Sequence, residues 1–453
     1  MIIRNARVLT FDAGNRVLDS ADVEIGDDGA IKRVEGVGGR VLGVGPGDPT
    51  PSHPTPSHPV IDARGRLLMP ALINCHTHLY STLARGIALP GPAPKNFPEI
   101  LKKLWWRLDR ALNPDDVYYS ALVGLVDAAK NGVGTLVDHH SSPNACAGSL
   151  DQVERAFREV GLRGVLCYET SDRDGPAKAQ AALAENVRFI ERAGRAGDGL
   201  VSASFGLHAS FTLSDRTLRQ AVEAEETLGA GFHIHVAEDR SDLDHARRRF
   251  KKTVVARLRD LGVMTDRTLA AHCIHVTAAD VAALARLGAK VAHNPQSNSN
   301  NAVGIARLIE LMKAGVLVGL GSDGYSPRMW EEFKTAFHLQ KLRTGDPRVG
   351  YAEAYAAALL NNRTIAKQLW GMDVGRVEAG ARADLILVDY YPPTPLDAGN
   401  VFGHLLFGIA NAPVDTLIVD GRVVLQDKRC VAVDEPAVAE RATRQAKALW
   451  QRF

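Results

Sequence analysis

The spacing of apolar residues along the chain changes twice, near residue 67 and near residue 375. Residues 1–66 alternate apolar and polar positions over short segments, which predicts strands joined by turns. The central part alternates short apolar runs with longer stretches of helical spacing. Beyond residue 375 strand patterns return, and residues 435–452 predict an amphipathic closing helix.

Eight strand-like runs lie in the central part, and helical stretches separate most of them. The predicted strands are 68–76, 133–139, 163–169, 201–208, 231–236, 268–273, 290–294 and 316–323. The predicted helices include Pro114–Asn131, Leu150–Val160, Ala177–Ala193, Ser214–Leu228 and Thr277–Leu287. Repeated strand–helix units of this kind are typical of the α/β class and of a (β/α)8 TIM-like barrel.

The two ends of the chain are predicted to form one small domain. Strand patterns at Asp384–Asp389 and Thr416–Leu425 follow the barrel, and Asp420-Gly421 is a two-residue hairpin signal. We expect these strands to join those of the N-terminal segment in a β-sandwich. The predicted domains are a catalytic barrel, 67–374, and a β-sandwich with a C-terminal helix, 1–66 plus 375–453.

A proline-rich stretch, Pro49–Pro59, interrupts the N-terminal strands and contains PTPSH twice. Proline lacks the backbone N–H that helices and sheets require, so we expect an extended surface loop. His53 and His58 could be proposed as metal ligands, but a loop of this kind does not preorganise a site.

Composition favours a folded protein with a sizeable core and gives no sign of nucleic-acid binding. Of 453 residues, 45% are hydrophobic and 23% are charged, which argues against overall disorder. The formal net charge of +2 gives no broad basic surface for nucleic acid, and no apolar run approaches the ~20 residues that span a bilayer. Five scattered cysteines without CxxC spacing, and no signal-peptide pattern, predict reduced thiols and a cytoplasmic location.

Chemically active side chains stand at the ends of nearly all predicted strands. They are His76, His78, His139, His140, Glu169, His208, His235, His272, His293 and Asp323. His76 and His78 stand two apart in an extended strand, so their imidazoles point to the same side. In barrels of this class the active site lies at the carboxyl ends of the strands.

Four of these residues form a candidate metal site: His76, His78, His235 and Asp323. An isolated His-x-His pair is weak evidence, and an isolated strand-end Asp is usually a turn or helix cap. Their joint occurrence at predicted strands 1, 5 and 8 favours a metal, with Zn²⁺ first and Fe²⁺ as the alternative. No lysine ends predicted strand 4, which favours one ion over a lysine-bridged pair.

Glu238 and His272 are candidates for catalysis. Glu238 lies just beyond a strand end, where it could take a proton from water at the metal. It could instead be an exposed residue in a helix's first turn, and Asp239 is a rival base. His272 could orient the water or polarise the reacting bond, or it could be a buried core histidine. Asp323 could also accept a proton during addition.

Seven further residues are candidates for substrate contact: Arg85, Trp105, Trp106, Glu169, His208, His293 and Asn294. Arg85 could bind a carbonyl or an anionic group. The tryptophans could cover a planar ligand, or one of them could pack in the core. The polar run Asn294–Asn301 could line a pocket or form a turn.

These motifs resemble the amidohydrolase superfamily along essentially the whole chain. The matching segments are Pro70–Gly86, Phe232–Asp239, Ala271–His275 and Gly319–Gly324. The segments Leu104–Leu112, Val137–Pro143, Tyr168–Arg173 and Pro393–Leu396 are similar to the SsnA-type aminohydrolases, which are related to mononuclear deaminases and triazine chlorohydrolases. Ala71 stands where the family commonly has glycine. The resemblance implies metal ligation by His76, His78, His235 and Asp323, proton transfer by Glu238, positioning by His272, and a homodimer or larger assembly.

The residues and the resemblance together predict metal-dependent hydrolysis of a C–N bond in a nitrogen heterocycle. Deamination of a purine- or pyrimidine-like compound is the leading hypothesis. Ring opening of a cyclic amide and dechlorination of a triazine-like ring are the alternatives. A non-catalytic scaffold is disfavoured by the complete ligand set, and a phosphotriesterase-like enzyme by the missing bridging lysine.

Overall fold

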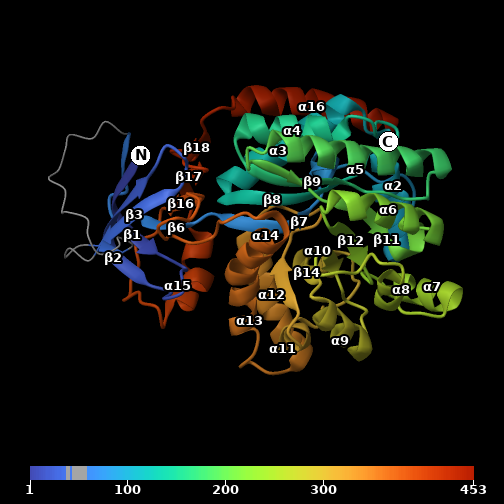
Figure 1. Ribbon diagram of the computed structural model, residues 1–453. Coiled ribbons are helices and arrows are strands. Elements are labelled where there is room, and N and C mark those ends of the chain that lie inside the picture. The colour runs from blue at the N-terminus through green and yellow to red at the C-terminus, as the bar shows by residue number, and fades with distance from the viewer. Residues whose placement is uncertain (37–40, 43–58) are drawn as a thin grey trace.

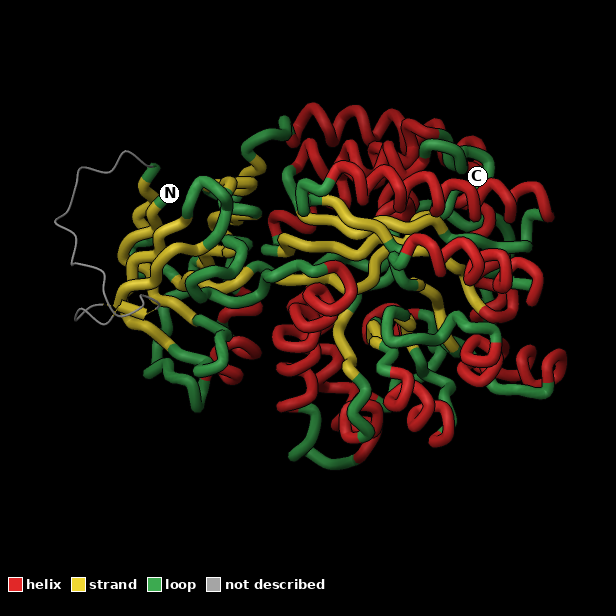
Figure 2. The backbone as a smooth tube through the Cα atoms, in the orientation of Figure 1, coloured by secondary structure: helices red, strands yellow, loops and turns green. Residues whose placement is uncertain are grey.

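The computed structural model describes residues 1–36, 41–42 and 59–453, so Pro49–His58 of the proline-rich repeat lie outside the described residues. Figure 1 shows a part rich in strands, built from both ends of the chain, beside a larger part in which helices surround strands. In the larger part the helices lie outside and the strands inside, as Figure 2 shows. The structure is therefore mixed α/β, as the sequence predicts.

The central strands form two parallel sheets. One has the order β10-β9-β8-β7, and the other runs β11-β12-β13-β14-β15. Two single bridges join the sheets: Thr77 of β7 pairs with Asp323 after β15, and Thr170 after β9 pairs with Leu207 of β11. The strands are β7 (Leu72–Thr77), β8 (Val133–His140), β9 (Arg163–Tyr168), β10 (Val201–Ala203), β11 (Phe205–Ala209), β12 (Phe232–Val236), β13 (Leu269–His272), β14 (Lys290–His293) and β15 (Leu317–Leu320).

The first predicted strand, 68–76, is divided in the structure. Its beginning, β6 (Leu67–Pro70), pairs with β1 and β16 in the sheet of the chain ends, and only β7 enters the central sheets. The direction changes at Ala71, whose N–H donates to the carbonyl of Asp384. The run at 201–208 is likewise divided, at Ser204.

The predicted helices occur close to their expected positions. They are α3 (Pro114–Lys130), α4 (Ser149–Val160), α5 (Pro176–Ala196), α6 (Asp215–Leu228) and α9 (Ala278–Leu287). Local chemistry sets several of their ends. Asn113 with Asp116, and Thr277 with Asp280, form capping boxes at the start of α3 and α9.

The remaining helices lie between or after the central strands, apart from α15, which lies beside the sheet of the chain ends (Figure 1). They are α1 (Phe97–Ile100), α2 (Trp106–Ala111), α7 (Arg240–Phe250), α8 (Val254–Asp260), α10 (Pro295–Asn300), α11 (Leu308–Lys313), α12 (Met329–Thr344), α13 (Tyr351–Tyr355), α14 (Asn362–Trp370), α15 (Val401–Phe407) and α16 (Glu435–Arg452). The closing helix α16 has the predicted extent and packs along α3. Its Trp450 Nε1–H donates to the carbonyl of Leu83, in the segment after β7.

Strands from both ends of the chain form one ten-stranded sheet. They are β1 (Ile2–Leu9), β2 (Val17–Ile25), β3 (Ile31–Gly36), β4 (Val41–Leu42), β5 (Val60–Asp62), β6, β16 (Leu385–Val388), β17 (Val414–Val419), β18 (Arg422–Gln426) and β19 (Arg429–Cys430). Asp420 and Gly421 form the predicted hairpin turn between β17 and β18, with φ of 55° and 74°.

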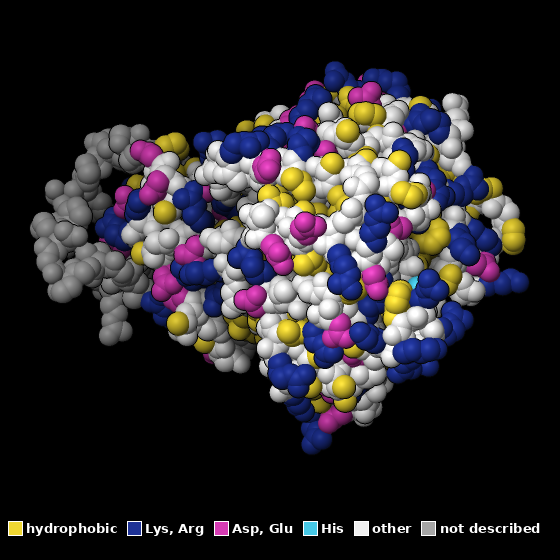
Figure 3. Space-filling model, turned by 45° about the vertical axis from the view of Figure 1, so that its right-hand side comes forward, with side chains coloured by type: hydrophobic (Ala, Val, Ile, Leu, Met, Phe, Trp, Pro, Cys, Tyr) yellow, Lys and Arg dark blue, Asp and Glu magenta, His cyan; other side chains and the backbone are white. Residues whose placement is uncertain are grey.

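On the face in Figure 3, Lys and Arg side chains stand among acidic, apolar and uncharged ones. In the part of the chain that the structure describes, no helix combines the length and the apolar character needed to cross a membrane.

A buried ion cluster links the sheet of the chain ends to the central strands. Arg163, at the start of β9, donates two hydrogen bonds of 2.9 Å to the carboxylate of Asp384. It also donates to Asp420 at 3.0 Å, in the β17–β18 turn. The side chains of Arg163 and Asp384 are only 4% and 2% exposed, so water solvates neither charge well. The two parts of the fold therefore share a desolvated charge pair.

Replacing Arg163 by methionine leaves the buried carboxylate of Asp384 without its cation, whereas Asp420 keeps its pair with Arg382. We expect the free energy of unfolding to fall by about 3–5 kcal/mol, since breaking a buried pair leaves an uncompensated charge. Urea unfolding followed by circular dichroism measures this change. As a matched control, Arg444→Met breaks an exposed pair with Glu440 and should shift the midpoint little. Equal midpoints for the two variants would contradict the role of this link.

Candidate metal centre and active site

Three histidines and one aspartate converge where β7, β12 and β15 end. The Nε2 atom of His78 lies 3.1 Å from Nε2 of His235 and 2.9 Å from Oδ1 of Asp323. Nε2 of His76 lies 3.4 Å from the same Asp323 oxygen. All four side chains are buried or nearly so. The structure thus brings together the four residues that the sequence predicts as ligands.

Backbone carbonyl groups determine which ring nitrogens are free. Nδ1 of His78 donates to the carbonyl of His139 at 2.6 Å, and Nδ1 of His235 donates to the carbonyl of His208 at 2.8 Å. A carbonyl oxygen only accepts, so both Nε2 atoms face the centre with a lone pair that can take a proton or a metal ion. Among the residues that the structure describes, Nε2 of His76 has no hydrogen-bond partner.

This donor set fits a divalent metal ion. Ligands at about 2.0–2.1 Å from Zn²⁺ in a tetrahedron stand about 3.3 Å apart, close to the separations at this centre. Three imidazole nitrogens and one carboxylate suit Zn²⁺ or Fe²⁺ better than Ca²⁺ or Mg²⁺. Burial lowers the pKa of His78, but the carboxylate of Asp323 outweighs this effect and the pKa rises to about 9. A proton therefore competes with any cation for Nε2 of His78.

Three strand ends in the centre carry residues in left-handed backbone conformations. Ala237, His272 and Asp323 have φ of 48°, 72° and 57°. Such conformations are unfavourable for residues other than glycine and are concentrated at functional sites. The N–H of Asp323 donates to the carbonyl of His76, and its Oδ2 accepts from Ser297 Oγ at 2.5 Å. These bonds hold the Asp323 carboxylate against the histidines.

Glu238 and His272 lie beside the four candidate ligands. His272 Nε2 stands 3.6 Å from Oε2 of Glu238 and 3.9 Å from Oδ2 of Asp323. Nδ1 of His272 donates to Asn298 Oδ1 at 2.8 Å, so its unpartnered Nε2 carries the lone pair. Burial, followed by the nearby charge of Asp323, raises the pKa of Glu238 well above its ordinary value. The rival Asp239 caps helix α7 by accepting from Ser241 N.

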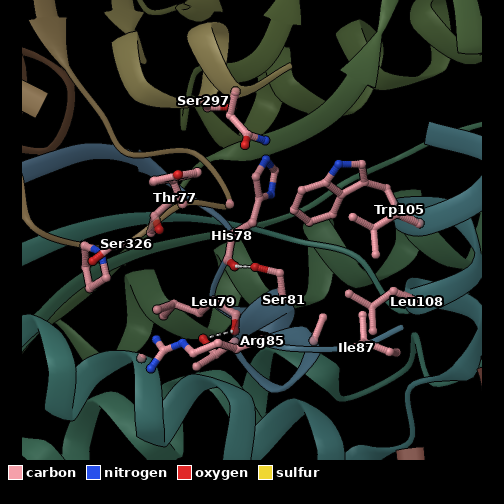
Figure 4. A pocket seen from close by; sticks show the side chains of 18 of the residues that line it. Thr77, His78, Leu79, Ser81, Arg85, Ile87, Trp105, Leu108, Ser297 and Ser326 are labelled. Atoms are coloured by element: carbon pink, nitrogen blue, oxygen red, sulfur yellow. Dashed lines mark hydrogen bonds between the residues drawn. The ribbon is translucent and has the colours of Figure 1, made fainter. Parts of the chain in front are cut away.

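A small inner cavity reaches the candidate ligands, and a larger cleft lies outside it. The inner cavity has a volume of about 40 Å³ and is lined by His78, His235, Glu238 and Asp323 among others. The outer cleft has a volume of about 630 Å³. Trp105 lines both, next to His78 in Figure 4, and packs so closely on Gly324 that a side chain there would overlap the ring.

The predicted substrate residues fall into three places. Trp105, Trp106, Glu169 and His208 line the inner cavity. Arg85 is exposed and lines the outer cleft (Figure 4). It pairs with Asp127 at 2.8 Å. His293 and Asn294 are buried in the structure, and Asn294 Nδ2 lies 3.4 Å from Nδ1 of His272.

Sequence reasoning did not assign the polar network behind Glu169. Arg173 Nη1 donates to Glu169 Oε1 at 3.1 Å, and Arg173 also pairs with Asp109 of α2. Burial raises the pKa of Glu169, but His208, His139 and Arg173 together hold it well below its usual range. The sequence signals were Glu169 and His139 at strand ends and the two segments Leu104–Leu112 and Tyr168–Arg173, whereas the pairing of Arg173 with Asp109 was not predicted.

Residues 67–424 match the sequence model of the amidohydrolase family. A 5-methylthioadenosine/S-adenosylhomocysteine deaminase of Desulforudis audaxviator is 36% identical over 456 residues, which cover 99% of each chain. A 5'-deoxyadenosine deaminase of Methanosarcina mazei is 32% identical over 458 residues, which cover 99% of this chain and 98% of the relative.

Solved structures of similar fold extend over the whole chain. A zinc-bound adenosine deaminase from Xanthomonas campestris superposes with a TM-score of 0.85 at 23% identity, covering 100% of this chain and 98% of the other. An atrazine chlorohydrolase from Arthrobacter aurescens TC1, complexed with zinc, superposes with a TM-score of 0.81 at 20% identity and 99% coverage of each chain. At 23% and 20% identity these structures show only that this chain shares their fold, which is of the TIM-barrel type.

Removal of one imidazole should remove metal from this centre. We expect His235→Ala to lose at least one equivalent of bound divalent ion, as measured by elemental analysis after dialysis. His245→Ala is the matched control, because His245 on α7 belongs to none of the groups of possible metal ligands in the described residues. Since a proton competes at His78, whose pKa is about 9, affinity should rise from pH 7 to pH 9 in a chelator competition. Equal metal content in the two variants would contradict the assignment.

Proposed function

The chain belongs to the amidohydrolase family, and from this premise we propose that it is a metal-dependent deaminase of a purine-like compound, with adenosine derivatives as its substrate class. The family places it among hydrolases of C–N bonds other than peptide bonds. The observation that carries the proposal is the position of Glu238, whose carboxyl group lies beside the converging donors of His76, His78, His235 and Asp323. The named deaminases match over 98% or more of their own lengths.

Glu238 is proposed to move the proton in this reaction. A divalent metal bound by the four ligands supplies Lewis acidity, which makes water a better nucleophile near neutral pH. Glu238 takes a proton from the attacking water while the water oxygen bonds to the ring carbon that bears the amino group. Glu238 then returns the proton to the amino nitrogen, the C–N bond breaks, and ammonia leaves. A raised pKa suits a carboxyl group that must hold a proton between these steps.

His272 and Asp323 are proposed to orient the reacting groups. Because Nδ1–H of His272 is held by Asn298, its Nε2 lone pair can accept a hydrogen bond from the nucleophile or from the tetrahedral adduct. Asp323 accepts from Ser297 through one oxygen and lies against the histidines through the other, where it can also receive a proton during addition.

The inner cavity and the outer cleft suggest how a substrate larger than a purine base is bound. We propose that the purine ring reaches the inner cavity beside Trp105 and that the remainder of the molecule lies in the outer cleft. Trp106, Glu169 and His208 then contact the inner part, and Arg85 the outer part. For His293 and Asn294 we propose a supporting position beside His272.

The proposal also covers the metal, the domains, the oligomeric state and the location of the protein. Zn²⁺ is the first candidate for the metal and Fe²⁺ the second. The single bridges between the two central sheets support one closed (β/α)8 barrel within the predicted bounds 67–374, with β7 at Leu72 as its first strand. We further propose that the sheet of the chain ends curls into a β-sandwich and that the protein is a homodimer or larger. Five free, buried cysteines support a reducing cytoplasm.

Glu238→Gln tests the proton transfer directly. The amide keeps the size of the side chain but cannot accept the proton, so we expect ammonia release to fall by at least 10²-fold, within the range attributed to general acid–base catalysis. Metal content should stay at the unmodified level, because Glu238 is not proposed as a ligand. Asp239→Asn is the control and should retain most activity. Full activity of Glu238→Gln would reject the assignment.

A substrate screen separates deamination from its alternatives. We expect 5′-substituted adenosines to release ammonia and to yield the corresponding hypoxanthine nucleosides, as measured by a coupled ammonia assay and chromatography. Cyclic amides and chlorinated triazines are included in the same screen. Ring-opened acid or chloride without ammonia from any purine would exclude the deaminase proposal.

A further inference from the structure

A buried carboxyl group lies behind the turn that carries Glu238. Asp242 belongs to the first turn of α7, and it is only 3% exposed. Its Oδ2 accepts a hydrogen bond of 3.0 Å from the backbone N–H of Ala237, the residue between the end of β12 and Glu238. Asp242 therefore holds the backbone at the residue that precedes the proposed base.

Ala237 is a strained residue that is held on both sides. Its φ of 48° lies in the left-handed region, which is unfavourable for residues other than glycine. Its carbonyl oxygen accepts from the N–H of His275 at 2.9 Å, while its own N–H donates to Asp242. A strained conformation persists only where surrounding bonds maintain it. Because the dihedral angles of Ala237 set the direction in which the chain continues, these bonds also determine where Glu238 points.

Asp242 is not the residue that caps α7. Asp239 is the N-cap and accepts from Ser241 N at 2.9 Å. Asp280 stands at the equivalent third position of α9, where it accepts from the N–H of its own N-cap, Thr277, at 2.9 Å. The side chain of Asp242 instead passes its N-cap and bonds to the turn before it. An acidic residue in a first turn is favoured by the helix dipole, but that effect alone requires neither burial nor this bond.

The burial of this carboxyl group is unfavourable for stability. Among the residues that the structure describes, Oδ1 of Asp242 has no hydrogen-bond partner. Burial raises the pKa of Asp242 to about 7, although the N–H of Ala237 and the charge of Arg257 act in the opposite direction. A buried polar atom without a partner costs free energy and requires an explanation. The bond to Ala237 supplies that explanation.

We propose that Asp242 is a positioning residue of the deaminase reaction, which fixes the turn at Ala237 and thereby directs the carboxyl group of Glu238 toward the four candidate metal ligands. The proposal rests on the proposed function, because it assumes that Glu238 transfers the proton. Asp242 acts only through Glu238, since it belongs to none of the groups of possible metal ligands in the described residues.

Loss of this bond should affect the chemical step more than binding. A general base must lie within about 2.6–3.2 Å of the group whose proton it takes. A misplacement of about 1 Å can cost about 10²-fold in rate. His235 is held separately, because β12 pairs with β11 on one side and with β13 on the other. The metal ligands therefore stay in place when the turn at Ala237 relaxes.

The variant Asp242→Leu tests the positioning role. Leucine has the same branched skeleton but accepts no hydrogen bond, and Phe97, Leu101 and Phe211 line the same small cavity as Asp242. We expect kcat for ammonia release to fall by about tenfold to 10²-fold. KM and metal content should stay nearly unchanged. Asp242→Asn keeps an oxygen for the N–H of Ala237 and should restore most of kcat.

Asp280→Leu is the matched control. Asp280 is also buried and occupies the same position in its helix, but its bond stays within the cap of α9. We expect this variant to lower the thermal midpoint without lowering kcat. A loss of kcat equal to that of Asp242→Leu would overturn the proposal, because it would show that any broken helix start impairs the reaction.

A double-variant cycle shows whether Asp242 acts through Glu238. In the Glu238→Gln background the proton can no longer be transferred by residue 238, so Asp242→Leu should cause no further loss of kcat. Losses that multiply in the double variant would overturn the proposal. Loss of metal from Asp242→Leu would do the same, because it would place the defect at the ligands.

The outcomes separate this proposal from the proposed function. Low activity of Glu238→Gln together with full activity of folded Asp242→Leu would reject the role of Asp242 and leave the deaminase proposal intact. Full activity of Glu238→Gln would reject the assigned base, and with it both proposals. Thermal midpoints show whether each variant folds. If Asp242→Leu does not fold, Asp242→Ala takes its place in every comparison with the same expected result.

Discussion

The hydrogen bonds from histidine Nδ1 atoms to carbonyl groups at neighbouring strand ends are the interaction on which the site depends. His78 donates to the carbonyl of His139, and His235 donates to the carbonyl of His208. Each bond fixes the tautomer and the ring plane of one histidine by means of an adjacent strand. The central sheets therefore do more than carry ligands, because the pairing of one strand with the next orients the lone pairs that a cation requires.

The strained backbone at the strand ends completes this arrangement. Ala237, His272 and Asp323 adopt left-handed conformations that cost about 1–2 kcal/mol per residue. Such conformations persist where surrounding interactions hold them. Here the N–H of Asp323 donates a hydrogen bond to the carbonyl of His76, and Nδ1 of His272 donates one to Asn298. The stability of the fold thus supports a geometry in which Glu238, His272 and Asp323 face one point.

The sequence predicts what is local and periodic. The spacing of apolar residues located the central strands and five of the helices, and the Asp420-Gly421 turn was predicted from two residues.

Other features of the fold depend on partners that are distant in the chain. The division at Ala71 follows from pairing of β6 with β16, more than 300 residues away. The pairing of Arg173 was not predicted, because it lies in the turn after β9 and its partner Asp109 lies on α2, 64 residues earlier in the chain. The candidate ligands were predictable because the strand ends in this fold class meet at one place. The histidine tautomers were not, because they depend on hydrogen bonds to carbonyl groups of neighbouring strands.

The candidate metal ligands and the apolar wall of the inner cavity come from different segments of the chain. The inner cavity of about 40 Å³ holds only a few water molecules, so a purine ring requires its wall to move. Phe97, Leu101, Trp105 and Trp106 form that wall, and Leu101–Trp105 is a π-helical turn, a feature often found at functional sites. Families with one metal chemistry can differ in substrate, because function depends on the site built on the fold. The side chains of the segment from Phe97 to Trp106 therefore bound the space beside the candidate ligands, so a change in this segment alters the shape of the cavity without touching the histidines.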